Sequence, residues 1–211
     1  MDYVYFVLTI VCIWVIASLA ANLVVGYTGL MAIGHVGYIA IGAYTVAVLN
    51  IFGHVPYFAA VPIAVLATAA VACVTILPLL RLSAFYFGLG TLGLNVVIVE
   101  LLSNLAPRSE GAEGLFGMHL PPLMAGGGGR LAVSLVLTAL CAFVAWRIVS
   151  SPFGRTLRAV RDQPEALASV GKDPNRYRVL IWTISGGVAG LAGALYAATL
   201  SYIDPTVFAV L

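Results

Sequence analysis

The sequence predicts an all-α membrane protein with about six transmembrane helices. Hydrophobic residues make up 62% of the 211-residue chain and charged residues only 9%, whereas a typical soluble domain carries about 25% charged residues. Because so few polar groups cannot cover a folded surface in water, most of that surface must face lipid. The net charge of +2 is too small to indicate a nucleic-acid partner.

Six apolar stretches are long enough to cross a bilayer, whose core of about 30 Å needs about 20 helical residues. They are residues 3–25, 27–50, 56–80, 84–105, 130–150 and 178–203. The first begins MDYVYFVLTI, with an acidic rather than a basic start. Its apolar run also exceeds the roughly 7–15 residues of a signal-peptide core, so we interpret it as a spanning helix.

The second stretch is the least regular, because glycines interrupt it at positions 26, 29, 34, 37 and 42. Backbone at membrane depth must remain hydrogen-bonded, so this stretch is either a tightly packed helix or a broken helix buried in protein. A broken helix would expose backbone groups to a solute path.

Four residues are candidates for a translocation pathway: Asn22, Gly34, His35 and Asn95. The two asparagines are polar groups at membrane depth that need partners. They either line a pathway or only tie helices together, and a lone histidine is more often a packing residue than a site. No charged residue lies at mid-membrane, which argues against an ion-coupled carrier and against an intramembrane hydrolase.

The distribution of Lys and Arg predicts the orientation. If odd-numbered stretches run inward, the cytoplasmic side holds Arg81, Arg147, Arg155, Arg158, Arg161, Lys172, Arg176 and Arg178. The outer side holds Arg108 and Arg130. This bias places residues 151–177 in the cytoplasm and makes residues 106–129, which are rich in glycine and proline, an external loop.

The polar stretch of residues 151–178 carries nine of the eighteen formal charges. Placing these charges in the bilayer would cost more than about 20 kcal/mol, so the stretch stays in water. Ser151-Pro152 is a typical helix start. Asp162 and Glu165 form an Asp version of a capping box for a second, short helix, and Gly171 is its expected C-terminal stop.

Asp173-Pro174 then starts the last helix, which enters the membrane. Two stripes of small residues run along it at four-residue spacing, Ser185-Ala189-Gly193-Ala197 and Gly186-Gly190-Ala194-Ala198. Such spacing lets helix backbones approach closely, so we expect these glycines to pack against neighbouring helices.

The sequence contains no P-loop, because the only lysine, Lys172, is not followed by Ser or Thr. The three cysteines lack CxxC spacing and indicate no metal site or disulfide framework. We therefore expect no catalytic residues, no metal and no cofactor.

Three collinear blocks resemble the permeases of branched-chain amino acid ABC importers, of the LivM type. The first is NLVVGYTGLMAIGHVGYIAIGAYT, and the second is YFGLGTLGLNVVIVELLSN followed by EGAEGLFGM. The third is FGRTLRAVRDQPEALASVGKDPNRYRVLIWTISGGVAGLAGALYA. Together they cover most of residues 19–208.

The resemblance implies one transmembrane permease domain over residues 1–211, in a bacterial-type inner membrane, that carries amino acids inward. It also implies a second permease subunit, two cytoplasmic ATPase subunits and a periplasmic or extracellular solute-binding protein. The short helix near 163–171 would dock on an ATPase, with Asp162, Glu165, Ala166, Leu167 and Gly171 as coupling residues and Leu167 as an apolar anchor. Val170, three residues later, shares its face.

Three alternatives stay open: a permease for another small solute such as urea, an amide or a sugar; an ion-coupled carrier; and a remnant that does not transport. Such permeases continue for several helices beyond the position of YIDPTVF. We therefore expect the chain to be a truncated version of a larger permease fold.

Overall fold

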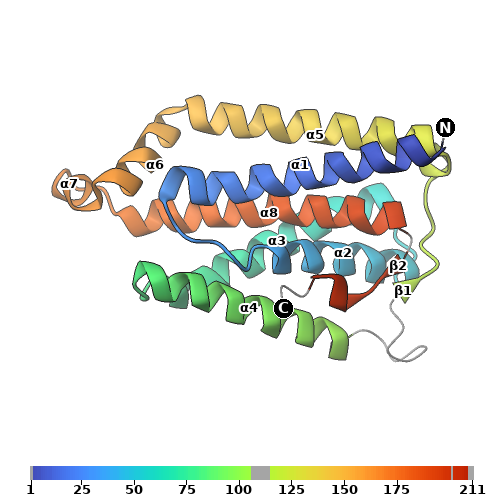
Figure 1. Ribbon diagram of the computed structural model, residues 1–211, viewed down its shortest axis with the longest axis horizontal. Coiled ribbons are helices and arrows are strands. Elements are labelled where there is room, and N and C mark those ends of the chain that lie inside the picture. The colour runs from blue at the N-terminus through green and yellow to red at the C-terminus, as the bar shows by residue number, and fades with distance from the viewer. Residues whose placement is uncertain (1, 106–114, 201, 209–211) are drawn as a thin grey trace.

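The computed structural model describes residues 2–105, 115–200 and 202–208. Within them, eight α-helices are α1 (Asp2–Thr28), α2 (Val36–Ile51), α3 (Tyr57–Leu79), α4 (Ala84–Leu105), α5 (Gly127–Ser150), α6 (Pro152–Asp162), α7 (Pro164–Ser169) and α8 (Pro174–Leu200) (Figure 1). Two 3-10 helices, η1 (Pro122–Met124) and η2 (Pro205–Phe208), and two short strands, β1 (Leu115–Phe116) and β2 (Tyr202–Ile203), complete the described elements.

Five helices are long and apolar enough to cross a membrane: α1, α3, α4, α5 and α8. They confirm five of the six predicted spans and the all-α membrane fold. The sixth stretch, residues 27–50, is not one continuous helix, because α1 extends to Thr28 and α2 starts only at Val36.

Residues 29–35 and α2 together replace that span. The 16 residues of α2 are about 24 Å long at about 1.5 Å per residue, short of a bilayer core of about 30 Å. The irregular segment runs back from the end of α1 towards the middle of the bundle, where α2 begins (Figure 1). Of the two interpretations of the glycine-rich stretch, the structure has the broken helix.

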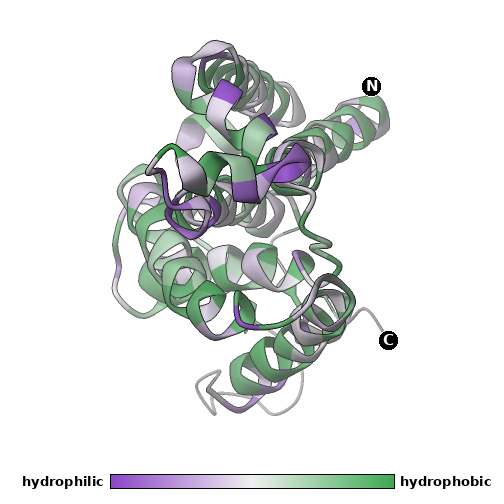
Figure 2. Cartoon of the chain, turned by 90° about the vertical axis from the view of Figure 1, so that its left-hand side faces the viewer, coloured by the Kyte–Doolittle hydropathy of each residue, from purple (hydrophilic) through white to green (hydrophobic). Residues whose placement is uncertain are grey.

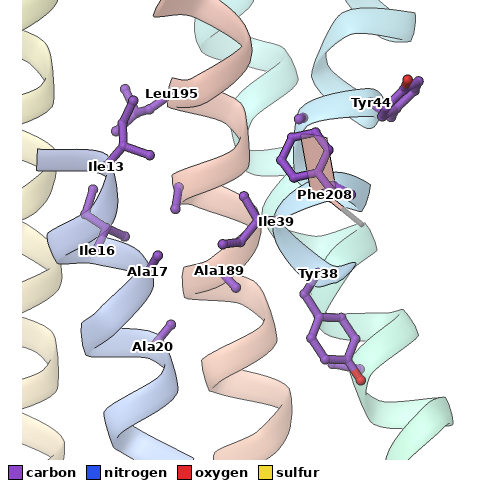
Figure 3. Close-up of a cluster of buried hydrophobic side chains, with 14 of the residues drawn as sticks. Ile13, Ile16, Ala17, Ala20, Tyr38, Ile39, Tyr44, Ala189, Leu195 and Phe208 are labelled. Atoms are coloured by element: carbon purple, nitrogen blue, oxygen red, sulfur yellow. The ribbon is translucent and has the colours of Figure 1, made fainter. Parts of the chain in front are cut away.

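Helix α8 lies at the centre of the bundle and packs on α1, α2 and α3. Figure 3 shows it between Ile13, Ile16, Ala17 and Ala20 of α1 on one side and Ile39 of α2 on the other, with Ala189 and Leu195 filling the contacts. Helices α4 and α5 lie at the two edges (Figure 1), and their exposed apolar side chains provide a surface for lipid.

Glycines bring the backbones of α8 and its neighbours together. A Cβ atom on Gly193 would meet the Ile39 carbonyl oxygen and lie 2.8 Å from the Ala43 nitrogen, both in α2. Gly190 and Gly186 lie in the same way against Thr68 and Ala72 of α3. The small side chains of α8 thus allow close contact on two sides.

We expect Gly193→Ala to destabilise the chain by about 1–3 kcal/mol, because the methyl group would force α8 away from α2. The matched control is Gly93→Ala in α4, where the added Cβ has nothing within 4 Å and should leave stability unchanged or slightly raised. Unfolding of the two purified variants in detergent, followed by their apparent melting temperatures, measures the difference. Equal melting temperatures would contradict the close approach of α2 and α8.

At the end of the bundle opposite α7, the buried Asn50 ties the connecting segments together through its side chain. Its amide donates to the carbonyl oxygens of Val55 (3.0 Å) and His119 (3.1 Å), and its side-chain oxygen accepts from the His119 N–H. Strands β1 and β2 pair antiparallel near this point. The described part of the connection before α5 is therefore fixed to the bundle, while residues 106–114 of the predicted external loop lie outside the described residues.

Candidate functional site

The candidate site begins with α6, a strongly two-sided helix at the basic end of the bundle. Gly154, Leu157 and Val160 are buried, and Leu157 packs with Leu23 of α1 and Ile181 of α8. The arginines at positions 155, 158 and 161 are exposed on the same helix. Figure 2, which looks onto this end, shows the hydrophilic residues of the chain gathered there.

The predicted start of α6 is confirmed, and the predicted capping box of α7 is wrong. The Ser151 hydroxyl accepts from the Gly154 N–H at 3.4 Å and caps α6. Asp162, however, is still the last residue of α6, and Gln163 precedes α7 without a side-chain cap. One residue separates the two helices, so Asp162 cannot take the extended backbone that a cap requires.

Gly171 ends α7 as predicted. Its φ of 78° is a left-handed conformation that side chains with a Cβ resist. The Gly171 N–H donates to the Ala168 carbonyl at 3.0 Å, and the Lys172 N–H donates to the Leu167 carbonyl at 3.3 Å. These two bonds form the Schellman arrangement that satisfies the last carbonyls of a helix.

The expectation that Leu167 presents an apolar anchor to a partner is wrong. Leu167 is 7% exposed, because α7 packs on α6 and α8 and turns this side chain towards them. The exposed apolar residue is Val170, at 71%, and Glu165 and Ala166 are exposed as well. Leu167 holds α7 in place, and the outer surface is formed by its neighbours.

Arg161 joins α6 to the break before α2, a contact that the sequence did not indicate. Its guanidinium donates to the Gly26 carbonyl at 2.6 Å, and its stem lies against Gly29. It thus satisfies one of the carbonyls that a helix end leaves free. Gly29 itself has a φ of 71°, so the first residue of the break is left-handed, and it stays exposed beside the Arg161 stem.

His35 occupies a buried junction at the other end of the break. Its Nε2 lies 3.0 Å from the Ser185 hydroxyl of α8, which also donates to the Ala20 carbonyl of α1. The His35 Nδ1 has no hydrogen-bond partner among the described residues. The ring meets Tyr38 and Trp182 edge-on, at centroid distances of 5.4 and 6.0 Å. Ser185 therefore links three segments of the chain.

A second polar contact joins α2, α3 and α8 beside His35. The Trp182 indole N–H donates to the Tyr38 hydroxyl at 2.9 Å, and that hydroxyl lies 2.7 Å from the Thr75 hydroxyl. All these groups come from helices around the start of α2. The buried side chains around the start of α2 thus make several polar contacts with one another.

Helix α4 packs against the same region at Gly34 and Gly37, on either side of the start of α2. The Gly34 N–H donates to the Thr91 hydroxyl at 3.3 Å, and Gly37 packs against Asn95. The Asn95 amide donates to the Phe208 carbonyl at 3.3 Å, while its oxygen has no partner among the described residues. Gly34, His35 and Asn95 thus surround the start of α2, whereas Asn22 is exposed and lies in a separate cavity beside α6.

The matching family model is that of the branched-chain amino acid transport system permease component, and it covers residues 3–211. A curated relative is the high-affinity branched-chain amino acid transport system permease protein LivM of Escherichia coli (strain K12). It is 33% identical over 95% of this chain and 53% of LivM. The guanosine ABC transporter permease protein NupQ of Bacillus subtilis (strain 168) is 26% identical over 82% of this chain and 60% of NupQ.

The autoinducer 2 import system permease protein LsrC of Escherichia coli O9:H4 (strain HS) is 29% identical over 63% of this chain and 42% of LsrC. No solved structure matches the chain. The chain spans about half the length of the curated LivM relatives that it matches.

The family match over nearly the whole chain and the five apolar spans agree with the resemblance read from the sequence. They identify a multi-pass permease of a bacterial-type inner membrane. The chain belongs to the permease components of the branched-chain amino acid ABC transport systems.

Proposed function

We propose that the chain moves branched-chain or related amino acids inward, as a permease subunit whose transport is driven by ATP hydrolysis on separate subunits. The observation that carries the proposal is α7, a six-residue helix that projects beyond the ends of the spanning helices (Figure 1). Its inner side is held by Leu167 and its end by Gly171, while its exposed side is free for a partner.

The partners follow from the family. They are a second permease subunit, two cytoplasmic ATPase subunits and a periplasmic or extracellular solute-binding protein. The absence of a P-loop in this sequence supports a separate ATPase. In this arrangement Glu165, Ala166 and Val170 touch the ATPase, whereas Leu167 and Gly171 position them.

Two contacts give α7 a physical route to the interior. Helix α6 lies directly before α7, and its Arg161 donates a hydrogen bond to the Gly26 carbonyl at the end of α1. Helix α8 starts three residues after Gly171 and carries Ser185, which contacts His35. A displacement of α7 would therefore act on both ends of the break at residues 29–35, where we place the translocation pathway with Gly34, His35 and Asn95.

A second class of solute is a candidate for transport by this chain. The relatives NupQ and LsrC are named for guanosine and autoinducer 2, so the same permease fold serves solutes other than amino acids. Another small solute is therefore the alternative to leucine, isoleucine and valine, and the solute-binding protein that assembles with the chain would decide between them.

Affinity purification from native membranes tests the proposal. The expected result is co-purification of a P-loop ATPase and a solute-binding protein that binds branched-chain amino acids, with uptake that requires ATP. A binding protein for another solute would support the alternative. Uptake into vesicles driven by an ion gradient, without an ATPase, would show an ion-coupled carrier instead, and the absence of uptake and partners would indicate a remnant.

The orientation provides an independent prediction. In a background without native cysteines, Ala125→Cys should react with an impermeant thiol reagent in intact cells and Ser169→Cys should not. Both positions are exposed, and the excess of basic residues at the α7 end predicts that α7 faces the cytoplasm. Labelling measured before and after permeabilisation checks this. The opposite pattern would overturn the orientation and the ATPase contact with it.

A further inference from the structure

A cavity of about 420 Å³ lies at the basic end of the bundle, between the end of α1 and the second half of α6. Its lining residues are Asn22, Gly26, Tyr27, Arg158, Arg161 and Asp162. Two guanidinium groups thus face one carboxylate. Among the described residues the only ion pair joins Arg176 to Asp173, so Asp162 makes no ion pair with either arginine. The cavity lining keeps a net positive charge, which favours an anion.

The two arginines keep donors available for a ligand. Arg161 donates from Nη1 to the Gly26 carbonyl, and Arg158 makes one long bond, of 3.5 Å, to the Val149 carbonyl. A guanidinium carries five N–H donors in a fork that matches an oxyanion. The Asn22 side chain lies over Gly26, which has no Cβ to displace it, and it adds an amide to the same wall.

The position of the cavity relates it to the membrane surface. Val11, Val15, Ser18 and Asn22 share one face of α1 at helical spacing, and all four are exposed. The apolar part of this face, Val11 and Val15, lies at the middle of a spanning helix, and the polar Ser18 and Asn22 lead from it to the cavity at the helix end. A molecule with a negative headgroup and acyl chains would place its phosphate by the arginines and its chains along α1.

We propose that this cavity binds a phosphate oxyanion through Arg158 and Arg161, supplied at this depth by the headgroup of an anionic phospholipid. A free phosphate has the same chemistry but makes no use of the apolar face of α1. Asp162 opposes such a ligand because its carboxylate lines the cavity, and this gives the proposal a test of opposite sign.

The experiment measures the shift in apparent melting temperature of the purified full chain against concentration of three probes. They are dioctanoyl phosphatidylglycerol, dioctanoyl phosphatidylcholine and inorganic phosphate. We expect a saturable shift with phosphatidylglycerol alone. Arg158→Gln should weaken the apparent affinity about tenfold, Arg158→Lys should retain most of it, and Asp162→Asn should strengthen it.

The matched control is Arg155→Gln, which removes the same charge one turn away on α6 but outside the cavity. It should change the affinity by less than about twofold at physiological salt. Arg158-dependent binding of inorganic phosphate alone would support the oxyanion site with free phosphate as its ligand. Equal shifts with both lipids, or equal weakening by Arg158→Gln and Arg155→Gln, would overturn the proposal, as would binding that Asp162→Asn weakens.

Discussion

Replacing Gly171 with valine is expected to abolish coupled uptake while the chain still inserts into the membrane. A valine at a φ of 78° costs about 1–2 kcal/mol in backbone strain. The strain would break the bonds from Gly171 and Lys172 to the last turn of α7, and six residues cannot hold a helix without them. Uptake in the assembled transporter should fall at least about tenfold, with ATP hydrolysis no longer stimulated by solute and binding protein.

Two further variants separate this effect from general damage. Gly171→Asn should retain most uptake, because asparagine tolerates the left-handed conformation better than valine does. Gly117→Val introduces similar strain at a φ of 86° at the opposite end of the bundle, and ATPase association should survive it. If Gly117→Val released the ATPase as fully as Gly171→Val, the loss would reflect stability and not the position of α7.

The second large effect is expected at Leu167 in α7 and at Val170, the residue that follows α7 as its C-cap, for different reasons. Leu167→Asp places a carboxylate in a buried position, where an unpaired charge costs several kcal/mol, so α7 should detach from α6 and α8. Val170→Asp changes a side chain that is 71% exposed, so the fold should persist while the contact with the ATPase is lost. Co-purification of the ATPase, together with the melting temperature of the permease, distinguishes the two.

We expect both variants to release the ATPase and only Leu167→Asp to lower the melting temperature. Arg155→Gln, on α6 and away from α7, should do neither. Normal uptake and a normal complex in Val170→Asp would mean that the exposed side of α7 has no partner and that the polar segment only fixes the topology.

The features that the sequence predicts correctly depend on local chemistry. Ser151, Pro152 and Gly171 act on backbone groups within a few residues of themselves, so their roles can be read from spacing alone. The capping box failed because spacing does not reveal how many residues separate two helices. Asp162 and Glu165 have the right separation, but α6 extends through Asp162 and leaves no room for a cap.

The features that the sequence could not predict depend on contacts between distant segments. Arg161 bonds to a carbonyl 135 residues earlier, and Ser185 lies beside a histidine 150 residues earlier. Nothing in the local sequence marks either contact. The break at residues 29–35 is similar, because glycines permit both a helix and a break, and the packing of Gly34 on Thr91 decides between them.

Leu167 shows the same limit within one short helix. Its spacing to Val170 predicts a shared apolar face, but that face could turn inwards or outwards. Contact of α7 with α6 and α8 buries one residue and leaves the other exposed, so the docking surface follows from tertiary packing and not from the pattern.

Photocrosslinking from position 166 tests the central claim most directly. Ala166 is exposed on α7, so a photoreactive amino acid there should capture whatever α7 touches in native membranes. The account predicts an adduct with a subunit that contains a P-loop, and none with that subunit from the matched position Ala125 at the opposite end. Capture of the ATPase from Ala125, or no adduct from position 166 in membranes where the ATPase co-purifies, would contradict it.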